Sequence, residues 1–456
     1  MSSAAAAQDM TLAAALPGGA GQPGQLPRLL AGIPAHGAMT LEHHLATHGP
    51  LPAVAPARRR RESSLVEEVE RSGLLGRGGG SFPLASKLRA VAAAGRRSVV
   101  VVNAAEGEPA SSKDRTLLQS LPHLVLDGAD LAAQALGATE VIVAVCRSFR
   151  AGAERATAAV AERRGSRGST APMNVAIVPD HYLAGQESAL VSCLNGRGPY
   201  PTFTPPLPAQ RGVDRRPTLV SNVETLAQLA LVARHGPQWF RALGTPSQPG
   251  SALVTLSGPV AQPGVYEIEY GSSLRSLIQA AGGATDDARA ALFGGYGGTW
   301  VDGGLLGTLA LSDEHLAPHR AALGAGVVLL LSARACPLAE TTRVARWLSS
   351  QSSGQCGPCV NGLQALAATV GELAGGAAPA RAPQRLEHLA ALVHGRGACR
   401  HPDGAAEFIL SAAQVFAREF ADHARHGRCD ACAGAPEMPL GTTAAAGARR
   451  ETAAAR

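Results

Sequence analysis

Three short runs of apolar residues constrain the fold of this chain more than any other feature of its sequence. Residues 98–102 (Ser-Val-Val-Val-Val), 141–145 (Val-Ile-Val-Ala-Val) and 175–178 (Val-Ala-Ile-Val) are rich in β-branched side chains and show no polar alternation. Such runs are typical of strands buried on both faces of a sheet. Because helix-like segments separate them, we predict an α/β domain with a parallel sheet over residues 61–245.

Polar and charged side chains directly follow the first of these runs. Residues 103–109 read Asn-Ala-Ala-Glu-Gly-Glu-Pro, so Asn103, Glu106 and Glu108 come just after an all-apolar strand. Ligands of parallel sheets bind outside the carboxyl ends of the strands, where polar groups have no packing role. We therefore expect a ligand site here rather than a solvated loop.

A second candidate for ligand contact is the glycine-rich stretch 76–83 (Gly-Arg-Gly-Gly-Gly-Ser-Phe-Pro). Its glycines leave backbone N–H groups unshielded, and Arg77 and Lys87 flank them with positive charge. It is not a dinucleotide-binding G-x-G-x-x-G turn, because Ser81 replaces the last glycine; a plain flexible turn is the alternative. The only lysines are Lys87 and Lys113, which indicates positions that need a compact ammonium group.

The rest of the chain divides by composition and pattern. Residues 1–60 are rich in Ala, Gly and Pro and are expected to form a disordered or extended N-terminal arm, and residues 431–456 a disordered tail. Short strand signals and turns over residues 246–335 predict a small α+β domain. Helical patterns over residues 336–430 predict a four-helix bundle, with helices at about 339–350, 359–374, 384–394 and 405–424.

Composition excludes several classes of protein. The net charge is +6 and only 4% of the residues are aromatic, so the interleaved basic and aromatic residues of nucleic-acid-binding proteins are missing. No apolar run approaches the roughly 18 residues of a membrane helix, so we expect no direct membrane insertion. No basic segment followed by an apolar core opens the sequence, and a cytoplasmic location is expected.

The cysteines indicate a metal site rather than a disulfide framework. Cys146 and Cys193 lie in apolar patterns and are expected in the core, while the role of Cys336 stays open. Cys356 and Cys359 form a Cys-x2-Cys pair at the start of a predicted helix, and Cys399 follows between the last two helices. By themselves these thiols suit zinc and an iron–sulfur cluster equally well.

Five stretches, taken in order, are similar to the motifs of one known family. They begin at Gly76, Asn103, Tyr182, Pro217 and Ser352, and they cover roughly residues 60–425. The chain resembles the F subunit of bacterial NADH–quinone oxidoreductase, and we expect a divergent, stand-alone member. The resemblance implies an FMN-binding domain, then a ubiquitin-like SLBB domain, then a helical bundle that ligates a 4Fe–4S cluster.

The resemblance also implies roles for individual residues. Hydride would pass from NADH to FMN, and electrons would pass from there to the cluster and to a ferredoxin-like or thioredoxin-like iron–sulfur protein. Phe82 and Glu108 would face the nicotinamide nucleotide. The flavin would be held by Gly76, Arg77, Gly78, Lys87, Asn103, Glu106, Tyr182, Gly185, Glu187 and Asn222.

Departures from the family pattern concern NAD and the cluster most. Leu207 and Ala90 replace aromatic residues at the dinucleotide, so NADH binding is expected to be weak. Ser353 stands at the position of the first cluster cysteine, which leaves Cys356, Cys359 and Cys399 as thiolate ligands and either Ser353 or an open site at the fourth position. The competing fourth ligands are Cys429 and Cys432 in the tail. An electron relay independent of NADH and a non-catalytic metal-binding or SLBB interaction module remain the alternative functions.

Overall fold

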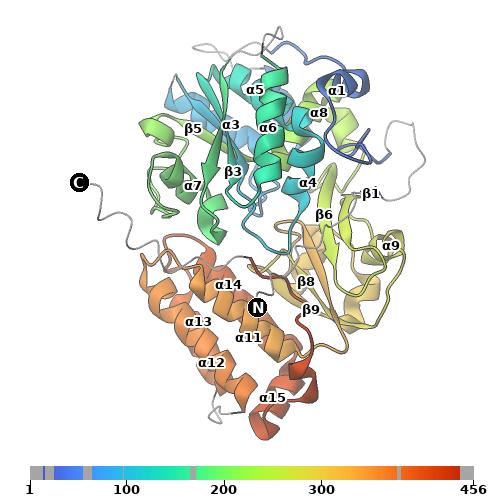
Figure 1. The fold of residues 1–456 in the computed structure, drawn as a ribbon, viewed down its shortest axis with the longest axis vertical. Helices are drawn as coiled ribbons and strands as arrows, with labels where there is room; N and C mark the ends of the chain where they lie inside the picture. Colours follow the sequence, from blue (N-terminus) through green and yellow to red (C-terminus); the bar gives the residue numbers. More distant parts are fainter. Residues whose placement is uncertain are drawn as a thin grey trace.

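A computed structural model describes residues 14–15, 25–54, 64–95, 97–164, 171–376 and 382–441. Three parts are evident in Figure 1: an α/β domain at the top, drawn blue to green, a yellow sheet domain, and an orange-to-red helical bundle below them. This is the predicted order of an α/β domain, an α+β domain and a helical domain, and the fold class is confirmed.

The α/β domain is built on a four-stranded parallel sheet of order β4-β3-β2-β5. Val100 and Val102 of the central strand β2 point into one core, and Val99 and Val101 point into another, so the strand is buried on both faces as predicted. The strands are β2 (Val99–Ala104), β3 (Glu140–Cys146), β4 (Met173–Val178) and β5 (Thr218–Asn222).

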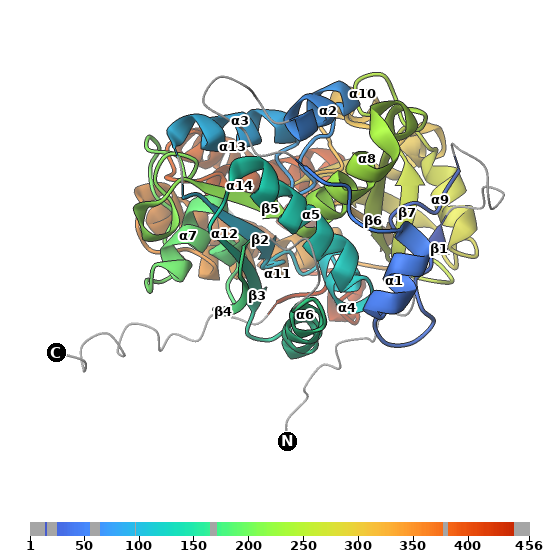
Figure 2. The same cartoon turned by 90° about the horizontal axis from the view of Figure 1, so that it is seen from above.

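Helices cover both faces of this sheet, as the view from above shows (Figure 2). Two of them, α5 and α8, approach so closely that a Cβ atom at Gly128 would lie 1.8 Å from the Leu226 carbonyl oxygen, and glycine is therefore required there. The helices are α2 (Ser64–Ser72), α3 (Leu84–Ala94), α4 (Lys113–Ser120), α5 (Pro122–Leu136), α6 (Arg150–Glu162), α7 (Glu187–Leu194) and α8 (Val223–Arg241).

The second domain is a mixed six-stranded sheet of order β1-β7-β6-β10-β8-β9. Alternate residues of its strand β10 pack on two sides: Val328 and Leu330 lie in the core beneath α9, and Val327 and Leu329 pack against the helical bundle. Its elements are β1 (Ala14–Ala15), β6 (Ser251–Ser257), β7 (Gly264–Glu269), α9 (Leu274–Ala280), β8 (Ala288–Phe293), β9 (Thr299–Asp302), α10 (Asp313–Leu316) and β10 (Val327–Ser332).

The helical domain follows the predicted pattern closely, with one further break at Phe416 that divides the last predicted helix in two. A π-helical turn at Pro358–Leu363 contains Cys359 and leads into α12, and Cys356 lies just before this turn. The helices are α11 (Pro337–Ser350), α12 (Gln364–Gly375), α13 (Ala382–Val393), α14 (His401–Val415) and α15 (Ala417–His426). In the described part of the chain, no helix combines the length and the apolar character that spanning a membrane requires.

The expected disordered or extended N-terminal arm, residues 1–60, is wrong for residues 25–54. These residues include helix α1 (Leu41–His48), and Leu29, Leu30 and Met39 are buried in the core of the α/β domain. The backbone N–H groups of residues 28–30 donate to the Glu267 carboxylate at 2.9–3.1 Å. The apolar residues of the arm are too scattered to show a period, which is why the sequence concealed this packing. Residues 1–13, 16–24 and 55–60 lie outside the described residues.

The expected disordered tail, residues 431–456, is likewise wrong for residues 431–441. We call residues 429–441 the strap. Its backbone N–H groups at Glu437 and Met438 donate to the Glu340 carboxylate of α11 at 3.1 and 3.3 Å, and the Met438 side chain is 2% exposed. One buried methionine and a few backbone contacts leave no periodic pattern that a sequence could reveal. Residues 442–456 lie outside the described residues.

Candidate functional site

A cavity of about 640 Å³ lies where the three domains meet. The carboxyl ends of β2 and β5 contribute Asn103 and Asn222, and the sheet domain contributes glycines such as Gly297. The helical domain contributes Cys399 from the segment before α14. This volume is within the range of about 300–1,000 Å³ that small-molecule and cofactor sites occupy.

Most of the predicted ligand-contacting residues lie in the wall of this cavity, namely Arg77, Gly78, Asn103, Glu106, Glu108, Tyr182, Gly185 and Asn222. Four others, all described by the structure, are not in the wall: Gly76, Phe82, Lys87 and Glu187. Lys87 Nζ instead contacts Glu187 Oε1 at 3.4 Å and the Val220 carbonyl oxygen at 3.2 Å. Phe82 is 52% exposed.

Glu106 is fixed by the start of helix α4. Its carboxylate accepts hydrogen bonds from Ser111 Oγ at 2.5 Å and from the backbone N–H groups of Asp114 at 3.2 Å and Arg115 at 3.1 Å. Burial, and next the charge of Asp114, raise the pKa of Glu106. The carboxylate is therefore a rigid part of the cavity floor.

Lys113 holds together the residues around Asn222. Its ammonium group lies 2.8 Å from Asp114 Oδ1, 3.0 Å from Glu224 Oε2 and 3.3 Å from Asn222 Oδ1. Burial acts to lower the pKa of Lys113, but the surrounding carboxylates outweigh it and raise the pKa above its ordinary value. A compact ammonium group fits among these three oxygens, in agreement with the retention of lysine here.

Arg77 lies at the junction of the first two domains. Its guanidinium donates to the Ser251 carbonyl oxygen at 3.1 Å, lies 3.7 Å from the Glu224 carboxylate and stacks 4.7 Å above the Tyr270 ring. These partners occupy much of the guanidinium, so Arg77 joins the domains as well as lining the cavity.

Glu108 and Tyr182 connect the cavity to the other two domains. Glu108 accepts hydrogen bonds from the Tyr296 N–H at 2.8 Å, the Ala110 N–H at 3.2 Å and Tyr182 Oη at 3.5 Å. Burial raises the pKa of Glu108 to about 7, against the opposing effect of these donors. The Tyr182 ring lies 5.4 Å from the Trp347 ring of the bundle in an edge-on contact.

His401 continues this contact into the bundle. Its ring lies 5.4 Å from the Tyr182 ring, and Nε2 is 3.0 Å from the Leu348 carbonyl oxygen. Burial lowers the pKa of His401 to about 4, so the ring is neutral and its N–H donates to that carbonyl. His401 therefore packs and hydrogen-bonds beside the cavity without adding charge.

The glycine-rich stretch 76–83 fits a flat anionic cofactor. A Cβ atom at Gly78 would touch Asn222 Cβ at 3.4 Å, and one at Gly79 would meet no atom closer than 3.9 Å, so side chains there would project into the cavity region. Gly79 also has a φ of 97°, which favours glycine. Arg320 and Arg400 add positive charge on the other walls. Unshielded backbone, amide groups and nearby cations suit the ring and phosphate of FMN.

The structure brings Cys356, Cys359 and Cys399 together. Burial raises the pKa of the Cys359 thiol to about 12, and the neighbouring sulfurs of Cys356 and Cys399 act in the same direction. Ser352, which the sequence reasoning missed, hydrogen-bonds to the Cys359 thiol. Ser353, the predicted ligand, donates from Oγ to Gln355 Oε1 at 3.2 Å. The adjacent serines gave no signal that would separate their roles.

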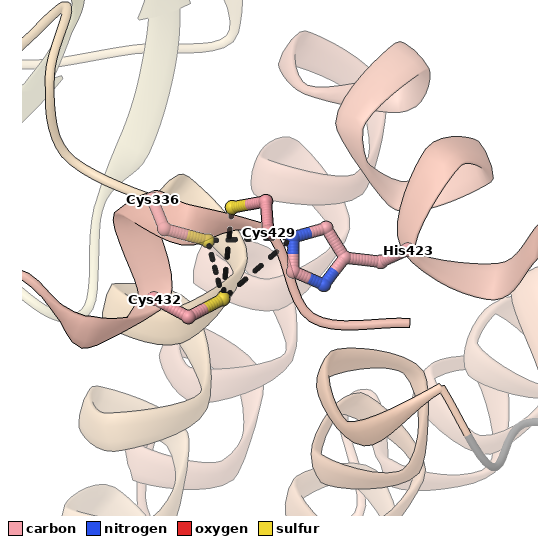
Figure 3. Close-up of side chains that lie close together, drawn as sticks. All are labelled: Cys336, His423, Cys429 and Cys432. Carbon is pink, nitrogen blue, oxygen red and sulfur yellow. Dashed lines mark hydrogen bonds between the residues drawn. The ribbon is translucent and has the colours of Figure 1, made fainter. Parts of the chain in front are cut away.

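A second sulfur site lies elsewhere in the helical domain (Figure 3). One ligand atom from each of Cys336, His423, Cys429 and Cys432 lies within 4.8 Å of the others. Cys429 and Cys432 thus group with Cys336 and His423, and not with the first three thiols. His423 was missed because a lone histidine in a helix carries no signal by itself. Cys146 is a buried core residue, and Cys193 packs partly buried against the same core.

Comparisons with family models match all three domains. The Nuo51 FMN-binding domain matches residues 69–231, the SLBB domain matches residues 253–299, and the NADH-ubiquinone oxidoreductase-F iron-sulfur binding region matches residues 339–423. The fold and the matched domains therefore define an oxidoreductase whose cofactors are FMN and a 4Fe–4S cluster.

Similar proteins narrow this class to one family. The F 2 subunit of NADH-quinone oxidoreductase in Rhizobium meliloti is 32% identical over 80% of this chain and 90% of its own length. The NADP-reducing hydrogenase subunit HndC of Solidesulfovibrio fructosivorans is 28% identical over 81% of this chain and 78% of its own length. A crystal structure of NAD+-reducing NiFe hydrogenase superposes with a TM-score of 0.73 at 32% identity, covering 78% of this chain and 62% of that chain. The chain belongs to the family of the NADH–quinone oxidoreductase F subunit.

Proposed function

We propose that this protein is an electron-input subunit, which takes electrons from a reduced nicotinamide nucleotide or another donor at FMN and passes them to a 4Fe–4S cluster. The observation that carries the proposal is the shared wall of the cavity: Cys399 lines it together with Asn103, Glu106 and Asn222. Flavin contacts and a cluster thiol therefore border the same space. FMN would supply the conversion of a two-electron input into one-electron steps.

The residues of the chain act by binding and placement. Asn103 donates from Nδ2 to the Gly185 carbonyl oxygen at 2.8 Å, which fixes its amide plane at the strand end. Asn222 is fixed in the same way between Asp114 and Lys113. Because these amides cannot rotate freely, they present the same donors and acceptors to a bound ring at all times. Tyr182 lies in the cavity wall beside the bundle, where its ring contacts Trp347.

Cys356, Cys359 and Cys399 are the proposed thiolate ligands of the cluster, with Ser353 as the fourth ligand. All four lie within the matched iron–sulfur region, which ends before Cys429. A serine alkoxide is a harder ligand with a far higher pKa than a thiol, so the fourth iron is expected to be labile.

Of the three cofactors, NAD has the weakest support in this chain. Two features support a nicotinamide nucleotide as the electron donor: the names of the relatives and one exposed loop. The relatives carry NADH, NADP or NAD+ in their names. Here Leu207, which replaces the aromatic residue of the family pattern, is 49% exposed, and Phe203 of the same loop is 68% exposed, so another aromatic side chain is available near this position. We propose weak nucleotide binding, with an NADH-independent relay as the second candidate because Ala90 and Leu207 remove two stacking partners.

The proposed acceptor is a ferredoxin-like or thioredoxin-like iron–sulfur protein in the cytoplasm. The test begins with protein purified without air. Rapid mixing with NADH, and separately with NADPH, is expected to bleach the flavin absorbance only at nucleotide concentrations well above the low micromolar range. Saturation at low micromolar NADH would disprove weak binding, and flavin that only a chemical reductant bleaches would favour the relay. Colourless protein without flavin would support the non-catalytic module instead.

A further inference from the structure

We propose that Cys336, His423, Cys429 and Cys432 bind one zinc ion, separate from the iron–sulfur cluster, and that this ion anchors the strap to the helical bundle. The four side chains point toward a common centre (Figure 3). Three cysteines and one histidine are a common ligand set of structural zinc sites.

The distances among the ligand atoms match one tetrahedral ion. Zinc bonds of about 2.3 Å to sulfur and 2.0–2.1 Å to nitrogen place two sulfurs about 3.8 Å apart and a sulfur and a nitrogen about 3.6 Å apart. The observed sulfur pairs are 3.7 Å for Cys429–Cys432 and 3.4 Å for Cys432–Cys336. His423 Nε2 lies 3.5 Å from Cys336 Sγ and 3.9 Å from Cys432 Sγ.

The same distances exclude the other uses of these thiols. The cysteine sulfurs around a cubane cluster lie roughly 6 Å apart, because each one binds a different iron. All four ligand atoms here lie within 4.8 Å of one another, which leaves no room for such a cluster. A disulfide would need a sulfur–sulfur distance of about 2 Å, and the Cys429–Cys432 sulfurs are 3.7 Å apart.

The surroundings prepare two of these groups to bind a metal. His423 Nδ1 lies 3.4 Å from the Ala374 carbonyl oxygen, so its N–H donates there and leaves the lone pair of Nε2 directed at the sulfurs. Cys336 is the N-cap of α11 and accepts a hydrogen bond from the Ala339 N–H at 3.4 Å. These two hydrogen bonds hold the ligand atoms in place before an ion binds.

The ion would tie the two ends of the helical domain together. Cys336 begins α11, His423 belongs to α15, and Cys429 and Cys432 lie in the first turn of the strap. From there the strap runs along α11: Trp347 Nε1 donates to the Gly441 carbonyl oxygen at 3.0 Å, and Tyr296 Oη donates to the Pro439 carbonyl oxygen. The Trp347 ring also contacts Tyr182 in the wall of the cavity. Zinc would therefore fix a segment that supports the cavity from outside.

The test is metal analysis of the whole protein purified without air, with and without Cys429→Ala plus Cys432→Ala; Cys193→Ala is the matched control because Cys193 lies outside both sulfur sites. We expect about one zinc per chain in the wild type and the control. The double variant should lose zinc, keep its iron and sulfide, and become susceptible to trypsin at Arg425 or Arg428. In wild-type protein grown with cobalt, the visible bands of tetrahedral thiolate-bound cobalt should appear, a readout that does not depend on a variant that folds.

Three results would overturn the proposal. The first is loss of iron and sulfide in the double variant with its zinc unchanged, which would make these cysteines cluster ligands. The second is wild-type protein without zinc and with a Cys429–Cys432 disulfide found by mass spectrometry. The third is cobalt protein that lacks the tetrahedral bands.

Discussion

The helical domain holds two groups of cysteines that lie in different surroundings. Cys356, Cys359 and Cys399 adjoin the cavity, and Cys399 lines it directly. The ligand atoms of Cys336, His423, Cys429 and Cys432 fit inside 4.8 Å, and their neighbours are helix ends and the strap. In our proposals the first group takes part in electron exchange, and the second holds chain segments together. Each group has three cysteines, so the number of thiols does not distinguish them, whereas their neighbours do: only the first group contributes a residue to the cavity wall.

The largest effect is expected for Cys359→Ser, which tests whether the two sulfur sites are independent. Cys359 is 2% exposed and serine is nearly isosteric, so the change removes a thiolate while it disturbs the packing little. Iron and sulfide are expected to fall below about a tenth of the wild-type content, since alkoxide replaces thiolate poorly. Zinc measured in the same samples should stay at the wild-type level. A parallel loss of zinc and iron would show that the two sites are one.

Gly78→Val tests whether FMN binds in the cavity, and a nearly complete loss is expected here too. The new side chain begins 3.4 Å from Asn222 Cβ, so its methyl groups crowd the proposed flavin contacts. Purified protein should lose FMN, measured by its absorbance and by mass spectrometry, and should retain zinc. Gly80→Val is the control, because a Cβ atom at Gly80 meets nothing within 4 Å and Gly80 does not line the cavity. Stoichiometric flavin in the Gly78 variant would show that FMN does not bind beside Gly78.

The cavity also contains a carboxyl group whose ionisation should affect stability. Because the pKa of Glu108 is raised to about 7 in the folded protein, its protonated form is favoured there, and stability is lost as the pH rises from about 4.5 to about 7. The free energy of unfolding should fall by up to about 3 kcal/mol over this window. Glu106 shifts in the same direction, so the measured quantity is the difference between wild type and Glu108→Gln.

Urea unfolding of flavin-free protein at pH 5 and at pH 8 provides that difference. Glutamine keeps an oxygen for the Tyr296 N–H, so Glu108→Gln should flatten the pH dependence without removing this hydrogen bond. If the free energy of unfolding changed equally between pH 5 and pH 8 in the two proteins, Glu108 would be ionised in the folded protein even at low pH.

The smallest expected effect concerns the fourth cluster ligand. Ser353→Cys should raise the iron content by about a third, from roughly three irons per chain toward four, because a thiolate replaces a weak ligand. Ser352→Ala should leave iron unchanged if Ser352 only hydrogen-bonds to Cys359. Iron that falls in Ser352→Ala but does not rise in Ser353→Cys would assign the ligand to Ser352.

The sequence predicted the structure correctly where a single short pattern allows only one stable environment. The β-branched run at Val99–Val102 has a single stable environment, the inside of a parallel sheet, and the polar residues after it had to lie at the carboxyl edge. Strand β5 was missed because Thr218–Asn222 mixes polar and apolar residues, although its end supplies Asn222 to the cavity.

It did not succeed where distant segments meet. Cys336 and His423 are 87 residues apart, and no spacing rule covers such a pair. The ion pair between Lys87 and Glu187 was not foreseen either, and the flavin contacts that the family resemblance implies for both residues stay a prediction. Side-chain partners of this kind depend on the final packing of helices, which local patterns do not encode.

The N-terminal arm has a consequence for how the protein is made. Arg28 donates its backbone N–H to Glu267, and the two residues are 239 positions apart. At a synthesis rate of about 5–20 residues per second, the arm leaves the ribosome roughly ten to fifty seconds before its carboxylate partner. Throughout this interval Leu29 and Leu30 lack part of the core that later buries them, including Leu253 and Val265. Residues 25–54 are thus synthesised early and complete their packing late, and in the interval their apolar side chains lack part of their core.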